Sequence, residues 1–253
     1  MCTPHLGAST GEAQIKVAIQ IAEQIVDLFK NKKIAGGVNA SDIEAGSNKE
    51  LNSYVKLAES FGLLQAQMIE GQLKQVNLTY SGELLHSSTN LLSTAAMKGF
   101  LSKMRTESVN YINAPFFSKE MGIVINETKT GANTDYKNLL EIEFITDKEK
   151  HSLAGTVFGN NEIRLVNVDG FYLELKPEGD MIFYSNVDRP GILASVGKIL
   201  AEANINIAGL SLGRSGKGEK AITVISIDSQ IDKNILKKIL EIEGIKNAFL
   251  VRI

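Results

Sequence analysis

The sequence has 253 residues, of which 43% are hydrophobic and 22% charged, a balance typical of globular proteins. A net charge of −2 without a basic run argues against nucleic-acid partners. The single cysteine, Cys2, excludes a disulfide framework and a cysteine-rich metal or iron–sulfur site. No apolar run approaches the roughly 20 residues of a membrane span, and no signal-peptide pattern is present. We therefore expect a cytoplasmic protein without a membrane partner.

The N-terminal region predicts one long helix over residues 9–30. Apolar residues recur at helical spacing from Ile15 to Phe29. Ser9 followed by Glu12 three residues later is the pattern of a capping box. The apolar stripe of this helix needs a surface to pack on.

A mixed domain is predicted over residues 49–179, after a glycine-rich and polar linker at 36–48. Its first half alternates helices with a strand, and its second half reads as consecutive strands with hairpin signals at Gly-Asn-Asn and Asp-Gly. The expected helices are Leu51–Phe61, Leu91–Leu101 and Phe116–Met121, and the expected strands are 34–38 near the linker, Val76–Tyr80, Ile123–Thr128, Leu139–Thr146, Ser152–Phe158, Glu162–Val168 and Phe171–Leu175.

Residues 180–253 predict the order βαββαβ, which is the ferredoxin-like pattern. The motif Asp-Arg-Pro-Gly ends the first strand; proline suits a first helical turn, and an aspartate before it can cap backbone N–H groups. The expected elements are strands at Met181–Val187, from Asn204 onward, at Ala221–Ile227 and at Ile245–Ile253, and helices at Ile192–Ala203 and Ile235–Leu240. This fold alone indicates no function.

The turn after the first of these strands is a candidate binding site. A helix N-terminus presents unpaired N–H groups to a small anion, and Asn186, Asp188 and Asn206 are the polar side chains around it. The structural alternative makes Asp188 only a helix cap and Asn206 only a turn residue. The motif and the later asparagine resemble the ACT domain, a ligand-sensing module of amino-acid metabolism.

The whole chain resembles the C-terminal part of the long-form D-3-phosphoglycerate dehydrogenases. TPHLGAST and GGVNA place residues 1–35 at the end of that family's catalytic region, VNYINAP and GTVFGNNEIRLVNVDGF place 49–179 in its intervening domain, and 180–253 match its ACT domain. The fold class is therefore α+β: an N-terminal helix remnant, a mixed intervening domain with an antiparallel sheet, and a ferredoxin-like ACT domain.

The resemblance makes His5 the catalytic acid/base of the parent reaction, the NAD-dependent oxidation of 3-phosphoglycerate to 3-phosphohydroxypyruvate. The family's other catalytic residues precede this motif. The nearest approach to a dinucleotide fingerprint, SGKGEKA, joins two strands and is expected to be a hairpin turn. We therefore expect no cofactor in this chain, with NAD belonging to the parent enzyme, and no dehydrogenase activity from the chain alone.

The resemblance also implies L-serine as a feedback effector, bound where the ACT domains of a homo-oligomer meet. Asp188 would pair with the ammonium group and Asn206 with the carboxylate or hydroxyl. The N–H groups of Gly191, Ile192 and Leu193 would face the carboxylate. Asn186 stands where the family varies.

Arg164 and Lys176 match positions that bind phosphate or phosphorylated substrate in some family members; a solvated surface role is the alternative. No metal site is predicted, since His86 and His151 are not at metal-ligand spacing. Two other functions stay open: a regulatory subunit of an L-serine dehydratase, and a stand-alone amino-acid-binding module acting on a separate catalytic chain.

Overall fold

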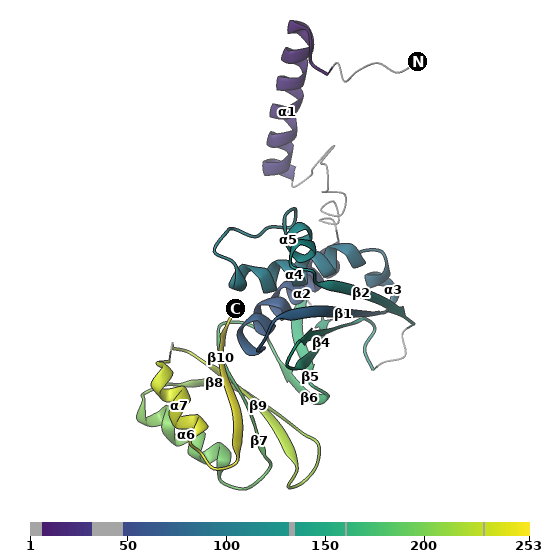
Figure 1. Cartoon of the computed structure of the whole chain (residues 1–253). Helices are drawn as coiled ribbons and strands as arrows, with labels where there is room; N and C mark the ends of the chain where they lie inside the picture. The colour runs from purple at the N-terminus through teal and green to yellow at the C-terminus, as the bar shows by residue number, and fades with distance from the viewer. Residues whose placement is uncertain (1–6, 32–47, 132–134, 160, 230) are drawn as a thin grey trace. The chain divides into compact units, whose positions relative to one another are not determined.

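A computed structural model describes residues 7–31, 48–131, 135–159, 161–229 and 231–253 (Figure 1). The chain divides into two compact units, at Lys49. His5, Cys2 and the strand predicted at 34–38 lie outside the described residues. The strands that the structure describes in the second unit form two sheets.

In the part of the first unit that the structure describes before residue 32, the chain forms a helix, α1 (Gly11–Asn31). Its cap is Thr10, whose Oγ1 accepts a hydrogen bond from Ala13 N at 3.2 Å. The predicted capping box at Ser9 is therefore wrong by one residue, because Thr10 takes the cap position. Apolar side chains of the predicted stripe are exposed, Phe29 at 72%.

The second unit begins with a six-stranded sheet in the order β2-β1-β3-β4-β5-β6. Glycines let α2 and α4 touch backbone to backbone: a Cβ on Gly99 would lie 2.1 Å from Glu59 O. Phe100 of α4 stacks on Phe144 of the sheet at 5.7 Å between ring centroids. The elements are α2 (Lys49–Met68), β1 (Leu73–Ser81), α3 (Glu83–His86), α4 (Thr89–Met104), α5 (Ala114–Glu120), β2 (Val124–Thr130), β3 (Leu139–Thr146), β4 (Lys150–Phe158), β5 (Glu162–Val168) and β6 (Phe171–Leu175).

The edge strand β2 runs parallel to β1, whereas the other neighbouring strands of this sheet are antiparallel. Helices α3 to α5 lie between β1 and β2 in the chain, and such a crossover is what a parallel pair requires. The sheet is thus mixed at one edge, where an antiparallel sheet was expected. The α+β fold class itself is confirmed.

The C-terminal part forms a four-stranded antiparallel sheet in the order β10-β7-β9-β8. Along β7, Ile182 and Tyr184 face α6 and α7, whereas Met181 and Phe183 face the other way. The predicted βαββαβ order is confirmed: β7 (Asp180–Val187), α6 (Ile192–Glu202), β8 (Ile207–Arg214), β9 (Lys220–Ile227), α7 (Lys233–Leu240) and β10 (Ile245–Arg252).

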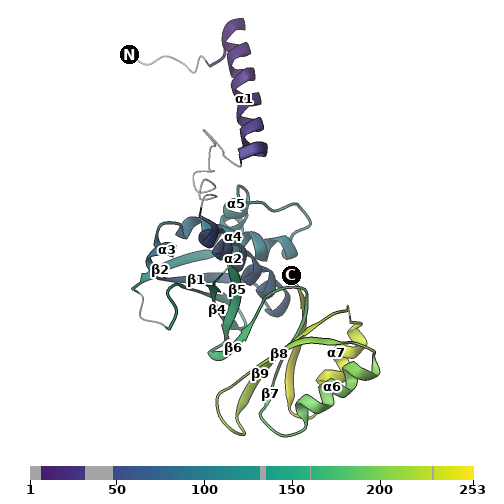
Figure 2. The ribbon, with the colours of Figure 1, turned by 180° about the vertical axis from the view of Figure 1, so that it is seen from behind.

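The two sheets of the second unit share one hydrophobic core, in which Met181 and Phe183 belong to the same cluster as Phe144. Gln67 Nε2 donates to Arg252 O, and Arg252 N donates to Gln67 Oε1, each at 3.1 Å. Strand β6 contacts the face of β8, where Glu174 N donates to Ser211 Oγ at 3.0 Å (Figure 2). This junction positions the polar sites described next.

Candidate functional site

The turn between β7 and α6 presents free backbone donors. Gly191 occupies the cap position with φ +95°, a conformation that L side chains rarely adopt. The first helical hydrogen bond runs from Ser195 N to Gly191 O at 2.9 Å, so Ile192 and Leu193 lie in the first turn, where N–H groups have no partner within the helix. The predicted N–H-bearing turn is therefore present, with Pro190 just before the cap.

Asp188 is not the helix cap. It precedes the cap residue Gly191 by three positions, and its carboxylate accepts from Arg214 Nη1 at 3.3 Å. The capping role considered for Asp188 is wrong because the turn residue Gly191 takes the cap position. The carboxylate faces an arginine at the end of β8, which the motif did not reveal.

The turn is held from two sides by backbone and side-chain bonds. Arg189 Nη1 lies 3.1 Å from Glu243 Oε1, and Arg189 Nη2 donates to Glu243 O. Val187 N donates to Gly244 O at 2.9 Å, and Asp188 N donates to Glu219 O at 2.6 Å. The arginine of the motif thus anchors the turn rather than pointing freely to solvent.

Asn186 lies inside the domain, 6% exposed. Its Nδ2 donates to Val187 O at 2.8 Å, while its Oδ1 is buried without a hydrogen-bond partner. The hydroxyl groups of Tyr184 and Thr223, which pair across β7 and β9, are also buried without a partner. Burial raises the pKa of Tyr184. Tyr184 and Asn186 also line the pocket described below.

Asn206 lies at the other end of β8 from Asp188. It is exposed, and its Nδ2 donates to Asp228 Oδ2 at 2.6 Å. Ile207 pairs with Ile227 at one end of the β8–β9 ladder and Arg214 with Ala221 at the other. Within one chain, the structure thus brings together Asn186, Asp188, Gly191, Ile192 and Leu193, but not Asn206.

Arg164 and Lys176 flank Leu165 and Leu175, which pair across β5 and β6, so the ladder places them as neighbours. Both are engaged by carboxylates. Arg164 lies 2.5 Å from Glu162 and 3.5 Å from Glu174, and Lys176 lies 2.6 Å from Glu178.

The glycines of SGKGEKA lie in the turn between β8 and β9, where Ser215 N donates to Lys220 O at 3.0 Å and Gly218 has φ +79°. A dinucleotide fingerprint would open a helix instead. The predicted hairpin is confirmed.

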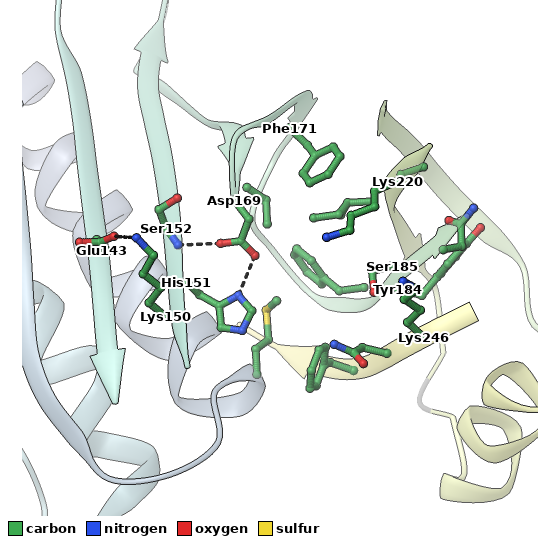
Figure 3. Close-up of a pocket in the computed structure, with 18 residues that line it drawn as sticks. Glu143, Lys150, His151, Ser152, Asp169, Phe171, Tyr184, Ser185, Lys220 and Lys246 are labelled. Carbon is green, nitrogen blue, oxygen red and sulfur yellow. Dashed lines mark hydrogen bonds and ion pairs between the residues drawn. The ribbon is translucent and has the colours of Figure 1, made fainter. Parts of the chain in front are cut away.

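A pocket that the sequence motifs did not indicate lies at the junction of the two sheets (Figure 3). It has a volume of about 550 Å³ and is lined by residues of β3, β4, the β5–β6 hairpin, β7, β9 and β10 and by the end of α2. Its charged and titratable lining residues are Glu143, Lys150, His151, Asp169, Tyr184, Lys220 and Lys246. These residues are spread over about a hundred sequence positions, so they can be recognised as a group only in the folded structure.

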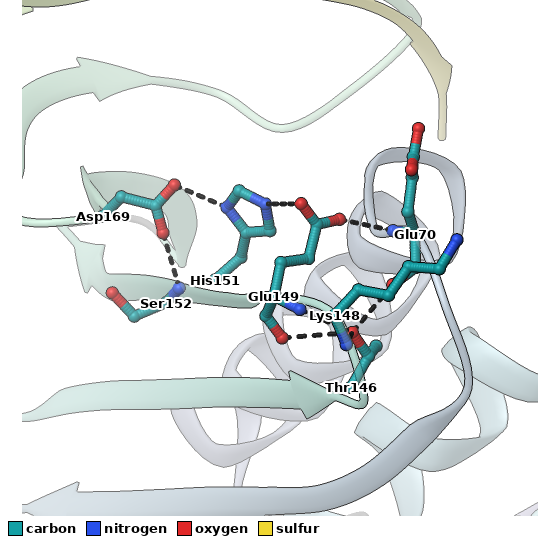
Figure 4. Close-up of polar contacts among 7 residues, drawn as sticks. All are labelled: Glu70, Thr146, Lys148, Glu149, His151, Ser152 and Asp169. Atoms are coloured by element: carbon teal, nitrogen blue, oxygen red, sulfur yellow. Dashed lines mark hydrogen bonds and ion pairs between the residues drawn. The ribbon is translucent and has the colours of Figure 1, made fainter.

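His151 in this pocket lies between two carboxylates (Figure 4). Its Nδ1 is 2.6 Å from Asp169 Oδ2, and its Nε2 is 3.6 Å from Glu149 Oε2. The hydrogen bond to Asp169 raises the pKa of His151, although burial opposes the shift. The raised pKa favours an imidazolium that balances the charge of Asp169.

Among the described residues, no helix combines the length and the apolarity needed to cross a membrane. The same residues contain no group of three or more His, Cys, Asp or Glu side chains arranged to hold a metal ion.

Comparison with known proteins assigns each of the two parts of the second unit to a known domain family. Residues 50–169 match the family model described as D-3-phosphoglycerate dehydrogenase intervening domain, and residues 181–244 match the ACT domain. Relatives named D-3-phosphoglycerate dehydrogenase cover 99% of the chain: those of Synechocystis and Methanocaldococcus jannaschii are 36% and 33% identical. The chain spans 46% and 48% of these relatives, about half their length. Residues 50–169 therefore belong to the D-3-phosphoglycerate dehydrogenase intervening-domain family, and residues 181–244 belong to the ACT domain family.

Proposed function

We propose that the chain is the regulatory part of a D-3-phosphoglycerate dehydrogenase and binds L-serine as a feedback effector between two ACT domains. The observation that carries this proposal is the placement of Asp188 and Asn206 at opposite ends of the edge strand β8. One chain cannot offer both side chains to one small ligand. A site that uses both therefore needs a second copy.

Antiparallel pairing of two β8 edges would supply that site. Strand β8 ends its sheet, and β6 contacts the face of β8 that carries Ser211. In a twofold pair, the N-terminal end of one β8 lies beside the C-terminal end of the other, so Asn206 of one copy approaches Asp188 and Arg214 of the second. Leu210 and Leu212 of this strand are 45% and 41% exposed, and pairing would cover them.

The groups at this meeting point suit an α-amino acid. Asp188 is an acceptor for the ammonium group, and the free N–H groups of Ile192 and Leu193 are donors for the carboxylate. Arg214, whose Nη1 lies 3.3 Å from Asp188, is a cationic donor for the carboxylate of the ligand. Asn206 from the second copy completes the set with a bond to the hydroxyl group.

The dehydrogenase reaction is proposed for a longer protein in which NAD binds outside this chain and His5 acts as acid/base. Serine binding would favour one arrangement of the ACT pair and so bias the catalytic part, with a coupling on the order of 1–3 kcal/mol. The chain alone is expected to form no NADH. The names of its relatives support this assignment over a serine dehydratase subunit.

Calorimetric titration of L-serine into the purified chain tests the proposal, with glycine and D-serine as ligand controls. We expect saturable heat from L-serine that Asp188→Ala reduces at least about tenfold in affinity, since a charge-assisted bond contributes roughly 1.5–3 kcal/mol. Asn206→Ala should reduce the affinity about two- to tenfold, since a neutral hydrogen bond contributes roughly 0.5–1.5 kcal/mol. Glu202→Ala, an exposed change at the far end of α6, is the matched control. A folded chain that gives no serine heat would overturn the effector assignment.

A further inference from the structure

A second pocket lies on the six-stranded sheet, on the face opposite α2 and α4. Leu140 and Ile142 of β3 are buried in the core with those helices, so Glu141 between them points to the other face. The pocket is lined by residues of β3 to β6 and of the segment just before β3. Its volume of about 600 Å³ lies within the range of roughly 300–1,000 Å³ that is usual for ligand pockets.

One row of paired residues crosses this pocket from β3 to β6. Each residue of the row pairs with the next, and all of them line the pocket: Glu141, Ala154, Asn167 and Tyr172. Three strand spacings of about 4.8 Å separate the backbones at the two ends of the row, which is roughly 14 Å. The small Ala154 leaves room between Glu141 and Tyr172, so the site suits an extended ligand.

The charges at this pocket do not cancel. Its charged lining residues are Asp135 and Glu141, and no lysine, arginine or histidine is among the described residues that line it. Neither carboxylate forms an ion pair or a hydrogen bond in the part of the chain that the structure describes. By contrast, Glu174 on β6 has its Oε1 3.5 Å from Arg164 Nε. The pocket therefore keeps two negative charges that a cationic ligand would balance.

Aromatic rings supply the other recognition element of the pocket. Tyr136 and Tyr172 both line it, and the ring centroids of Tyr136 and Phe158 are 6.1 Å apart. Burial, followed by the charges of Glu174 and Asp135, raises the pKa of Tyr136, so these carboxylates lie near its hydroxyl group. The faces of tyrosine rings attract ammonium groups. The rings and the carboxylates thus favour the same kind of ligand.

We propose that this pocket binds an organic cation with ammonium groups on a flexible carbon chain, of the diamine or polyamine class. The ammonium groups pair with Asp135 and Glu141, and the methylene groups lie over Ala154 against the tyrosine rings. A metal ion is a poorer fit, because the described residues hold no group of three or more His, Cys, Asp or Glu side chains that would coordinate one. The pocket shares Ser152, but no charged residue, with the pocket at the sheet junction.

Calorimetric titration of the full chain with putrescine and with spermidine, at constant ionic strength, tests the proposal. We expect saturable binding of at least one of the two, with one ligand per chain. The double variant Asp135→Asn/Glu141→Gln should weaken this binding at least about tenfold, because it removes two charge-assisted contacts. Tyr172→Leu removes one ring and should weaken it about two- to fivefold.

Two controls make the result specific. Glu83→Gln/Glu241→Gln removes the same charge from exposed positions in α3 and at the end of α7, and we expect affinity within about twofold of the unaltered chain, because distant exposed charges are screened. Mg²⁺ is the ligand control and should give no saturable heat. The proposal would be overturned by no saturable binding of either amine, or by binding that survives the loss of Asp135 and Glu141. Saturable Mg²⁺ heat that this double variant removes would also overturn it, in favour of a metal site.

Discussion

The β7–α6 turn and the pocket at the sheet junction are two candidate sites built on the same ACT sheet in different ways. The turn gathers its groups from residues 186–193, a single short stretch. The pocket gathers Lys150, Lys220 and Lys246 from three strands that are distant in sequence. A site of the first kind is visible as a motif, whereas one of the second kind exists only after the two sheets have packed together.

The two sites also differ in what holds their charged groups. In the turn, Asp188 contacts Arg214 and Arg189 contacts Glu243, so each charge already has a partner. In the pocket, Lys220 and Lys246 have none among the described residues. The turn should therefore keep its shape on its own, while the pocket should depend on the junction between the sheets.

The largest expected effect comes from opening that junction at Gly213. A Cβ at this position would lie 2.5 Å from Tyr172 O, so Gly213→Ala forces β6 away from β8. Overpacking of this kind costs roughly 1–3 kcal/mol in the free energy of unfolding. Urea denaturation measures this loss.

Gly209→Ala is the matched control on the same strand, because its Cβ would meet nothing closer than 3.8 Å. We expect its unfolding free energy to stay within about 1 kcal/mol of the original. Equal losses for both variants would show that the contact of β6 with β8 does not hold the junction.

The second-largest effect distinguishes the two sites by whether each needs a second copy of the chain. Leu212→Asp places a charge on the exposed edge strand, where it would oppose pairing of two copies. We expect analytical ultracentrifugation to show a loss of dimer and calorimetry to show at least about tenfold weaker serine binding, because each 1.4 kcal/mol of lost pairing energy is a factor of ten.

Leu240→Asp changes a leucine of the same 41% exposure on α7 and serves as its control. The pocket at the sheet junction should keep its shape in both variants, since one chain provides all of its lining residues. A Leu212→Asp chain that still dimerises through its ACT domain would contradict the β8 pairing.

The smallest effect concerns His151 and pH. Its pKa is raised in the folded chain by Asp169, so the stabilisation is fully present below the unfolded value of about 6.5. It is lost as pH rises through the folded pKa. The difference in unfolding free energy between the original chain and His151→Asn should therefore be larger at pH 6 than at pH 9, as measured by urea denaturation at both values. A difference that grows with pH would contradict the ion pair with Asp169.

Much of the fold followed from local patterns. The alternation of Met181–Val187 and the apolar spacing from Ile192 predicted β7 and α6, and the turn signals placed the hairpins of the intervening sheet. Two helix boundaries were predicted incorrectly. Helix α2 extends to Met68, beyond the predicted Phe61, and Thr10 rather than Ser9 caps α1.

By itself, the sequence determined the order of helices and strands, the ferredoxin-like pattern and the turn with its free N–H groups, because each depends on residues close together in the chain. Only the tertiary structure decided that β2 lies parallel to β1, that Asp188 and Asn206 stand at opposite ends of one strand, and that Lys220 and Lys246 share a pocket with His151. Strand pairing and sheet packing join residues far apart in sequence, and no local pattern encodes which of them will meet.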